Sequence, residues 1–387
     1  MMFKNSLFTI IIVLFIFSCK NNYDVDQNLT RSIRLENQEK AKASKFFSEI
    51  DYYLIKSDER FPLVNPYKTL LYGSRIFLLD KFQNFIFIYN QGGDLEKIIK
   101  DIGEGPDQFL QIDDFQVNNN EIIIKDGRTR KMLTYDFSGA LISVEKNNFL
   151  LGDFYKGEGV ELYYVNNDPQ FEGRIIKSKN GKISSMIPME PWMENKLFGS
   201  INGFMINPNT NTINYILPFG YQYLEFSNEG ELIKQVEFDF GKYSFKSEQR
   251  ARFNNFEDES KYLEGTEFIR NIFSIHPFGN GFLMYLMQEN RNRHYVWLDE
   301  NLHQKNQYAG IENDIDGMLL SLPPWTYSED AIYFLYYPGQ FINDYNSSFP
   351  NPQGDELKLN EGVHFFVNEN KDLLESENFV LVKLKIK

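Results

Sequence analysis

The sequence contains two matching stretches, Arg75-Ile-Phe-Leu-Leu-Asp80 and Glu121-Ile-Ile-Ile-Lys-Asp126, whose final aspartates lie 46 residues apart. Each is followed by a second apolar run, at residues 85–89 and 131–136, and then by a glycine-containing turn. Short runs of β-branched and aromatic residues between turn residues are typical of strands. A period of about 45 residues is that of a four-stranded propeller blade. The two stretches therefore predict two consecutive blades.

Weaker copies of the same pattern follow along the chain. We expect the third to sixth blades to contain residues 160–187, 214–240, 281–299, and 331–336 with 379–386. The apolar run at 50–55 is expected to pair with 379–386, which would close the ring and cover the last open sheet edge. The sequence thus predicts an all-β protein, a six-bladed β-propeller over residues 46–387.

Composition narrows the class of function. The formal charge is -14, from 54 acidic and 40 basic residues, so we expect no nucleic-acid partner, since binding to phosphates depends on clustered Lys and Arg. The chain has 36 Phe, 23 Tyr and 3 Trp, which suits a β-rich core. It has one cysteine, so no internal disulfide can form.

The N-terminal residues have the pattern of a bacterial lipoprotein signal. Lys4 supplies a positive charge, residues 7–17 are apolar, and Ser18 precedes the single cysteine, Cys19. The apolar run is shorter than the roughly 20 residues that a transmembrane helix needs. We therefore expect a signal peptide at 1–18, lipidation of Cys19 and attachment to a membrane by lipid. The expected location is the cell envelope, on the periplasmic or the external side of an outer membrane.

Three segments depart from the blade pattern. Residues 19–45 are polar and charged, which is typical of a tether. Residues 243–270 carry Phe253, Phe256 and Leu263 at roughly helical spacing, which predicts an amphipathic helix over one side of the ring. Residues 338–361 are rich in Pro, Gly, Asn and Ser, and we expect a long exposed loop there.

One local motif lies between the first two blades. It runs Ile102-Gly-Glu-Gly-Pro-Asp-Gln-Phe109, and Tyr135-Asp-Phe-Ser-Gly139 follows at the end of the second blade. Together with the lipid signal, these segments resemble the six-bladed β-propeller lipoproteins of Bacteroidota, which are related to NHL- and TolB-like propellers. In that family a Glu is usual where this chain has Gln108, and the glutamine is similar to NHL-type repeats. The resemblance implies the fold; it implies little about activity.

The resemblance also suggests where a metal could bind. Six-bladed lactonases and related hydrolases hold calcium in the central channel, and Asp113 and Asp114 are predicted at the start of an inner strand. Asp314 and Asp316 belong to an acidic string that starts at Glu312 and imitates an EF-hand loop. Its twelfth position is Pro323 where a bidentate Glu is required, so that interpretation fails. No cofactor is expected, with calcium at these aspartates as the alternative.

Residues of the predicted loops are candidates for ligand contact. Gly103, Gly105, Pro106 and Gln108 form the sharp turn between blades. Trp192 and Trp325 lie in proline-marked loops, where aromatic rings can stack on a sugar or a peptide side chain, although packing over a sheet edge is the simpler role. The four histidines are scattered, and neither His-Glu-x-x-His nor Gly-x-Ser-x-Gly occurs.

These observations favour a lipid-anchored, non-catalytic binding or scaffold propeller with a protein or glycan ligand. Two alternatives stay open. A calcium-dependent hydrolase or lactonase would require inward-facing carboxylates around one point in the channel. A glycan-binding lipoprotein would require several coplanar aromatic rings on one face.

Overall fold

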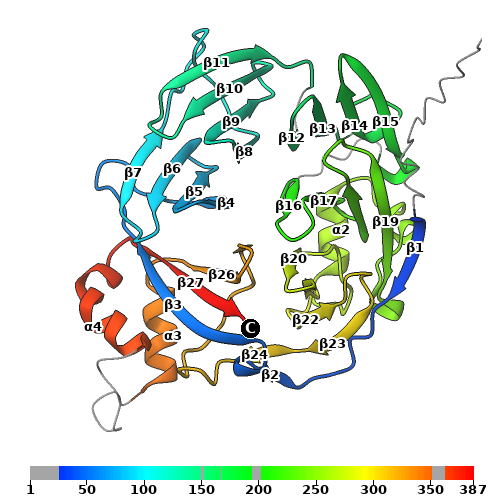
Figure 1. Cartoon of the computed structure of the whole chain (residues 1–387). Helices are drawn as coiled ribbons and strands as arrows, with labels where there is room; N and C mark the ends of the chain where they lie inside the picture. The colour runs from blue at the N-terminus through cyan, green and yellow to red at the C-terminus, as the bar shows by residue number, and fades with distance from the viewer. Residues whose placement is uncertain (1–25, 150–151, 167, 194–201, 351–361) are drawn as a thin grey trace, which may run out of the picture.

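Six antiparallel sheets follow one another around a ring (Figure 1). The structure, a computed structural model, describes residues 26–149, 152–166, 168–193, 202–350 and 362–387. Five of the sheets have four strands and one has five; four neighbouring strands form each blade, and the first of these lies next to the centre of the ring. This is the predicted six-bladed β-propeller, and we number its blades 1 to 6 along the chain.

The blades have the following strands. Blades 1 to 3 comprise β4 (Pro66–Tyr72), β5 (Arg75–Asp80), β6 (Phe85–Asn90) and β7 (Leu95–Ile99); β8 (Asp114–Asn118), β9 (Glu121–Asp126), β10 (Lys131–Asp136) and β11 (Leu141–Lys146); and β12 (Phe154–Lys156), β13 (Val160–Tyr164), β14 (Gly173–Lys179) and β15 (Lys182–Pro188). Blades 4 to 6 comprise β16 (Met205–Asn207), β17 (Thr212–Ile216), β18 (Gln222–Phe226) and β19 (Leu232–Asp239); β20 (Ser274–Phe278), β21 (Gly281–Met287), β22 (Arg293–Leu298) and β23 (Gln304–Tyr308); and β25 (Thr326–Tyr327), β26 (Ala331–Tyr336), β27 (Phe379–Ile386) and β3 (Phe47–Ile55).

The second strand of each blade is buried on both sides, because each sheet is packed between two neighbouring sheets. In β5, β9 and β26 every residue after the first is buried, which explains why these strands are almost continuously apolar. The fourth strands are partly exposed, as in β7 and β11, and carry more charge. The strongest sequence signal therefore comes from the middle of each blade.

The ring is closed by the N-terminal strand, as predicted. β3 pairs antiparallel with β27 from Phe47–Ile386 to Ile55–Phe379, so the last blade takes its outer strand from the start of the ring. Neither β3 nor β27 is then a free edge on that side.

The segment expected to be a tether differs from the prediction from residue 26 onward. β1 (Asp26–Ser32) adds to blade 4 by parallel pairing with β19, and β2 (Lys40–Lys42) pairs with β24 (Gly310–Glu312). Between them, Gln307 accepts a hydrogen bond from the Asn37 backbone amide at 2.9 Å. A polar strand gains stability from such pairing without leaving a hydrophobic period in its sequence, so composition alone predicted a tether.

The two irregular segments also differ from the predictions. In place of one helix, residues 241–263 contain η3 (Gly241–Tyr243), α1 (Ser247–Arg250) and α2 (Phe256–Leu263), and Asn255 caps α2 by accepting a hydrogen bond from the Asp258 amide. The expected loop at 338–361 contains α3 (Gln340–Ser348), followed by α4 (Gly362–Leu374). Phe341 and Tyr345 of α3 pack into the core of blade 6, and this tertiary burial overrides the loop-like composition. Two short 3-10 helices, η1 (Ala43–Lys45) and η2 (Pro191–Met193), complete the described elements.

The two ends of each blade differ in their connections. At one end, short connections join strand one to strand two and strand three to strand four. They range from two residues, as at 73–74, to five residues, as at 227–231. We call this the turn end. At the other end the chain joins strands two and three and passes between blades, with connections as long as residues 240–273 and 337–378. We call this the loop end.

Candidate functional site: the central channel

The six innermost strands surround a cavity of about 480 Å³, which we call the channel. All six contribute to its wall, from Tyr67 on β4 to Tyr327 on β25. The lining continues past the strands to Gly73, Pro208 and Ser328, which lie in turn-end connections. The channel therefore extends along the inner strands to the turn end of the ring.

The channel wall is largely apolar and aromatic. Aromatic side chains on or next to the inner strands of all six blades line it: Tyr67, Phe115, Phe154, Phe204, Phe273 and Trp325. Trp325, a predicted ligand contact, also joins two blades, since its indole nitrogen donates to Thr69 Oγ1 at 2.7 Å. A volume of this size with such a lining is typical of a small-molecule pocket.

His276 is a polar exception in this wall. Its side chain lines the channel and the residue is 1% exposed, yet among the described residues the Pro324 carbonyl is the one group near its ring nitrogens, and neither nitrogen makes a hydrogen bond of good geometry. Burial lowers its pKa to about 4, although the nearby Pro324 carbonyl opposes the shift. The imidazole is therefore neutral at pH 7, with one donor and one acceptor nitrogen.

A buried ion pair lies at the loop end of the channel. Lys68 Nζ is 2.7 Å from Asp114 Oδ1, and both side chains are at least 94% buried. Asp114 Oδ2 accepts a hydrogen bond from the Phe154 amide of the next blade at 3.1 Å. The backbone of Gly203 lies directly against the pair, because a β-carbon there would be 3.0 Å from Lys68 Nζ. The pair and this segment together obstruct the loop end.

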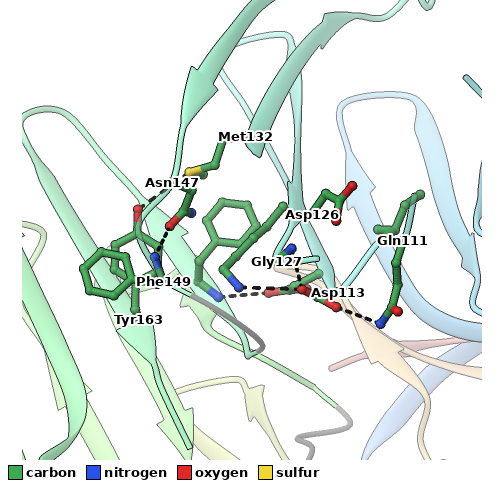
Figure 2. Close-up of polar contacts among 12 residues, drawn as sticks. Gln111, Asp113, Asp126, Gly127, Met132, Asn147, Phe149 and Tyr163 are labelled. Atoms are coloured by element: carbon green, nitrogen blue, oxygen red, sulfur yellow. Dashed lines mark hydrogen bonds and ion pairs between the residues drawn. The ribbon is translucent and has the colours of Figure 1, made fainter. Parts of the chain in front are cut away.

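Asp113 is held beside this pair by its own partners. Its carboxylate accepts hydrogen bonds from the Gly127 amide at 2.7 Å and from Gln111 Nε2 at 2.9 Å (Figure 2). Lys125 Nζ lies 3.8 Å from the same carboxylate. Burial raises the pKa of Asp113 and lowers that of Lys125, and each charge opposes the shift of the other. The two aspartates predicted as calcium ligands thus each face a lysine.

Asp153 adds a third buried carboxyl group to this cluster. It accepts a hydrogen bond from the Tyr215 hydroxyl at 2.7 Å. Burial, with the nearby Asp114 charge, raises its pKa from 3.8 to about 7. We call Lys68, Asp113, Asp114, Lys125 and Asp153 the charge cluster.

The acidic string that begins at Glu312 forms hydrogen bonds with the N-terminal part of the chain. Asp314 accepts hydrogen bonds from the amide and the hydroxyl of Ser44, and Asp316 accepts one from the Tyr52 hydroxyl at 2.6 Å. Within the ranges that the structure describes, no three His, Cys, Asp or Glu side chains converge as a metal site would require. The carboxylate oxygens in both predicted places instead contact lysines, amides and hydroxyls.

The Gly103–Phe109 turn is a connector between blades 1 and 2. The Gln108 side chain folds over both glycines: a β-carbon on Gly103 would lie 2.1 Å from its Oε1, which also accepts from the Gly105 amide at 3.0 Å. Lys131 donates to the Gly105 carbonyl oxygen. Pro106 is exposed, and Phe109 is completely buried. These contacts explain the glycines and the glutamine, and the structure does not bring them to the channel.

Trp192 lies away from the channel. It lines a second cavity of about 300 Å³ between blades 3 and 4, where its indole nitrogen donates to Glu190 at 2.7 Å. Trp192 and Trp325 therefore line different cavities. Cys19 and the predicted signal peptide fall outside the described residues. Among the described helices none is both long and apolar enough to cross a membrane.

Sequence reasoning missed Lys68 and gave His276 no role. Lys68 lies 46 residues before Asp114, the same interval that separates Asp80 from Asp126, so the repeat places both on inner strands of adjacent blades. Extending the repeat to β4 would have predicted this pair. His276 has no comparable signal, because its burial depends on how β20 faces the centre.

Comparisons with known proteins agree with this architecture. The model of the family DUF5128, described as a 6-bladed beta-propeller, matches residues 20–335. A solved structure of a Bacteroides fragilis protein inferred to be exported is similar, with 15% identity, a TM-score of 0.66, and coverage of 92% of this chain and 99% of that one. A Bacteroides vulgatus protein of the DUF4221 family has 11% identity, a TM-score of 0.50, and coverage of 88% and 97%.

These structural similarities, at low identity, concern the fold. No curated protein is significantly similar in sequence. The family match covers most of the chain, including blades 1 to 5 and the start of blade 6. This chain therefore belongs to the DUF5128 family of six-bladed β-propellers.

Proposed function

We propose that this protein is a binding protein of the cell envelope, anchored by lipid at Cys19, which takes a small aromatic ligand into its channel from the turn end. The observation that carries this proposal is His276, a buried imidazole in the wall of a largely apolar cavity: the Pro324 carbonyl can pair with one ring nitrogen only, which leaves the other without a partner among the described residues. A buried polar group that lacks a hydrogen bond costs about 1–3 kcal/mol. A ligand with one hydroxyl or amide group would offset that cost.

The anchoring part of the proposal rests on the sequence and on relatives. The lipoprotein signal ends at Cys19, and the similar Bacteroides fragilis protein is inferred to be exported. A periplasmic or external position follows from lipidation on the outer side of the inner membrane. The acidic chain, at -14, would remain soluble near an anionic membrane surface.

The channel favours binding over hydrolysis. A calcium-dependent hydrolase needs carboxylates free to hold the metal, whereas Asp113 and Asp114 face Lys125 and Lys68. Bringing a divalent cation there would place it against two ammonium groups. The apolar wall would instead supply binding energy through burial, at about 25 cal/mol per Å².

The test is titration of the purified protein with 2-naphthol, an aromatic probe with one hydroxyl that is followed by its own fluorescence. We expect saturable binding. Ile206→Trp, at the turn end of the channel, should weaken that binding at least tenfold by filling the entrance. The matched control is Ile142→Trp on β11, another exposed isoleucine, which lies outside the channel lining. Equal binding by the two variants would contradict a channel site.

A further inference from the structure

The second cavity, between blades 3 and 4, has its own unpartnered charges. The cavity has a volume of about 300 Å³. Its wall includes Arg174 on β14, Glu237 on β19, Glu190 and Trp192 at or next to η2, and Phe219 in the connection before β18. It lies at the loop end of both blades and is closed on one side by residues 244–250. It shares no lining residue with the channel.

Arg174 is a buried cation without a counter-ion. It is 3% exposed, and its one hydrogen bond is a long one, 3.4 Å from Nη2 to Gln222 Oε1. Nε has no partner, and within the described chain no carboxylate oxygen lies within 4.0 Å of the guanidinium. Burial lowers the pKa of Arg174, and nearby tyrosines and glutamates oppose that shift. A buried charge without a partner is costly unless an anion joins it.

Arg250 in the same cavity wall shows the ordinary arrangement. Its guanidinium is 3.1 Å from Glu259 Oε1, and it donates to the carbonyl oxygens of Phe245 and Arg270. Both side chains of that pair are almost fully buried. The fold thus gives Arg250 both a carboxylate and carbonyl partners. Arg174, in the same wall, has no carboxylate partner among the described residues.

The wall also contains a buried acid with one unpartnered oxygen. Glu237 Oε2 is buried and has no hydrogen-bond partner among the described residues. Burial raises the pKa of Glu237, and Gln222 and Arg174 oppose the shift. Glu190 and Asp239 line the same cavity. Three carboxyl groups around one open guanidinium disfavour phosphate or another pure anion, because a second negative charge would be repelled.

We propose that this cavity binds a small zwitterion of the α-amino acid class. Its carboxylate would pair with the Arg174 guanidinium, whose planar N–H groups suit a carboxylate. Its ammonium group would pair with Glu237, and its side chain would lie against Trp192 and Phe219. The proposal does not depend on the channel ligand, because the two cavities are separate.

The test uses the purified protein and the twenty common L-amino acids, each at 10 mM, in thermal melts. We expect at least one to raise the midpoint by about 2 °C or more. The same amino acid as its α-amide, which lacks the carboxylate, and as its N-acetyl derivative, which lacks the ammonium group, should each lose most of that shift. If no amino acid raises the midpoint, or if the amide acts as well as the parent, the proposal is wrong.

Variants separate a binding role from a structural one. Arg174→Met removes the open charge at nearly constant length, so it should keep or raise the melting temperature of the free protein and abolish the amino-acid shift. Arg250→Met is the matched control and should lower the melting temperature, because it removes the buried 3.1 Å ion pair with Glu259. A loss of stability in Arg174→Met as large as in Arg250→Met would overturn the proposal.

A second variant tests the contact with the ammonium group of the ligand. Glu237→Gln should fold and weaken the amino-acid affinity about tenfold, and unchanged affinity would contradict the ammonium contact. Ile206→Trp, which fills the channel, should leave the amino-acid shift intact. The two binding proposals can therefore fail separately.

Discussion

The turn end and the loop end of the blades are built from the same strands but have different contents. At the turn end the connections are as short as residues 73–74 and 119–120, and positive φ angles occur at Gly73, Asn119 and Asn120. At the loop end they reach the lengths of 240–273 and 337–378. The turn end is joined by short connections all around the ring, whereas the loop-end connections vary widely in length.

Most of the buried charge follows the same division, with Glu225 as an exception. The charge cluster, Asp80, Arg174 and the Arg250–Glu259 pair all lie at or beyond the loop ends of their strands. At the turn end, the ion pair Arg75–Glu96 has both side chains 35% exposed, whereas Lys234–Glu225 is 20% and 9% exposed. Long connections can cover charges and supply them with backbone partners, which two-residue turns cannot. The difference indicates that the long loop-end connections cover most of the buried charge.

The largest expected effect comes from breaking the buried pair at the loop end. Lys68→Met leaves Asp114 buried without its cation and should reduce the free energy of unfolding by about 3–5 kcal/mol. The matched turn-end variant, Arg75→Met, should cost about 0–1 kcal/mol, since its pair is exposed. Urea denaturation measures both. Equal losses would remove the proposed difference between the two ends.

A second contrast concerns aspartates that hold backbone amides. Asp80 accepts hydrogen bonds from the amides of Val64, Asn65, Phe82 and Gln83, so it ties the entry of blade 1 to its second strand. Asp80→Asn should cost about 2–3 kcal/mol, because amide oxygens accept less strongly than carboxylates.

The turn-end counterpart is Asp136, which accepts hydrogen bonds from the amides of Ser138 and Ala140 and is half-buried. Asp136→Asn should lower the melting temperature by less than Asp80→Asn. A larger loss at Asp136 would contradict the assignment of stability to the loop-end aspartates.

The pH dependence of stability should reveal the charge cluster. Asp153 has a pKa of about 7 in the folded protein against 3.8 when unperturbed, so between these values the folded state holds a proton that the unfolded state has lost. This group therefore makes the free energy of unfolding fall as pH rises from about 4 to 7. Asp153→Asn removes the titration and can still accept the Tyr215 hydroxyl.

We expect Asp153→Asn to be more stable than the parent by about 1–2 kcal/mol at pH 8, with the difference vanishing near pH 4. Denaturation at four pH values between 4 and 8 checks this. A variant that is less stable at pH 8, or a gap that does not close on acidification, would show that the carboxylate is stabilising in its charged form.

The smallest contrast compares two left-handed glycines. Gly73 has φ +57° and open space around it, so Gly73→Ala should cost about 1 kcal/mol from backbone strain alone. Gly203 has φ +63°, and a β-carbon there would lie 3.0 Å from Lys68 Nζ. Gly203→Ala should cost roughly 1 kcal/mol more, through displacement of the ion pair. The melting temperatures of the two variants measure these losses of stability. Equal losses would mean that the segment at Gly203 can move away from the ion pair freely.

Blades 1 and 2 were predictable because their information is local: Asp80 and Asp126, the apolar runs beside them and the glycine turns repeat within the sequence. The closing β3–β27 pair was predicted from the apolar runs at 50–55 and 379–386. The three-residue strands β12 and β16 are too short to leave a periodic signal. β1 was missed because its stability comes from pairing with β19, far away in the sequence.

The candidate site was predicted only in part. Asp114 and Trp325 were singled out and do lie at the channel, but their partners Lys68 and Thr69 come from other blades. Such contacts form only when the ring closes, so no local pattern contains them. Arg174 and His276 are informative because of the partners they lack, which requires a structure to see.

The most direct test of the channel as the ligand site is a crystal structure with 6-bromo-2-naphthol, whose bromine is located by anomalous scattering. The account predicts bromine density between the innermost strands, with the hydroxyl within hydrogen-bond distance of a His276 ring nitrogen. Bromine density confined to the outer surface, with the channel unoccupied at saturating probe, would contradict it.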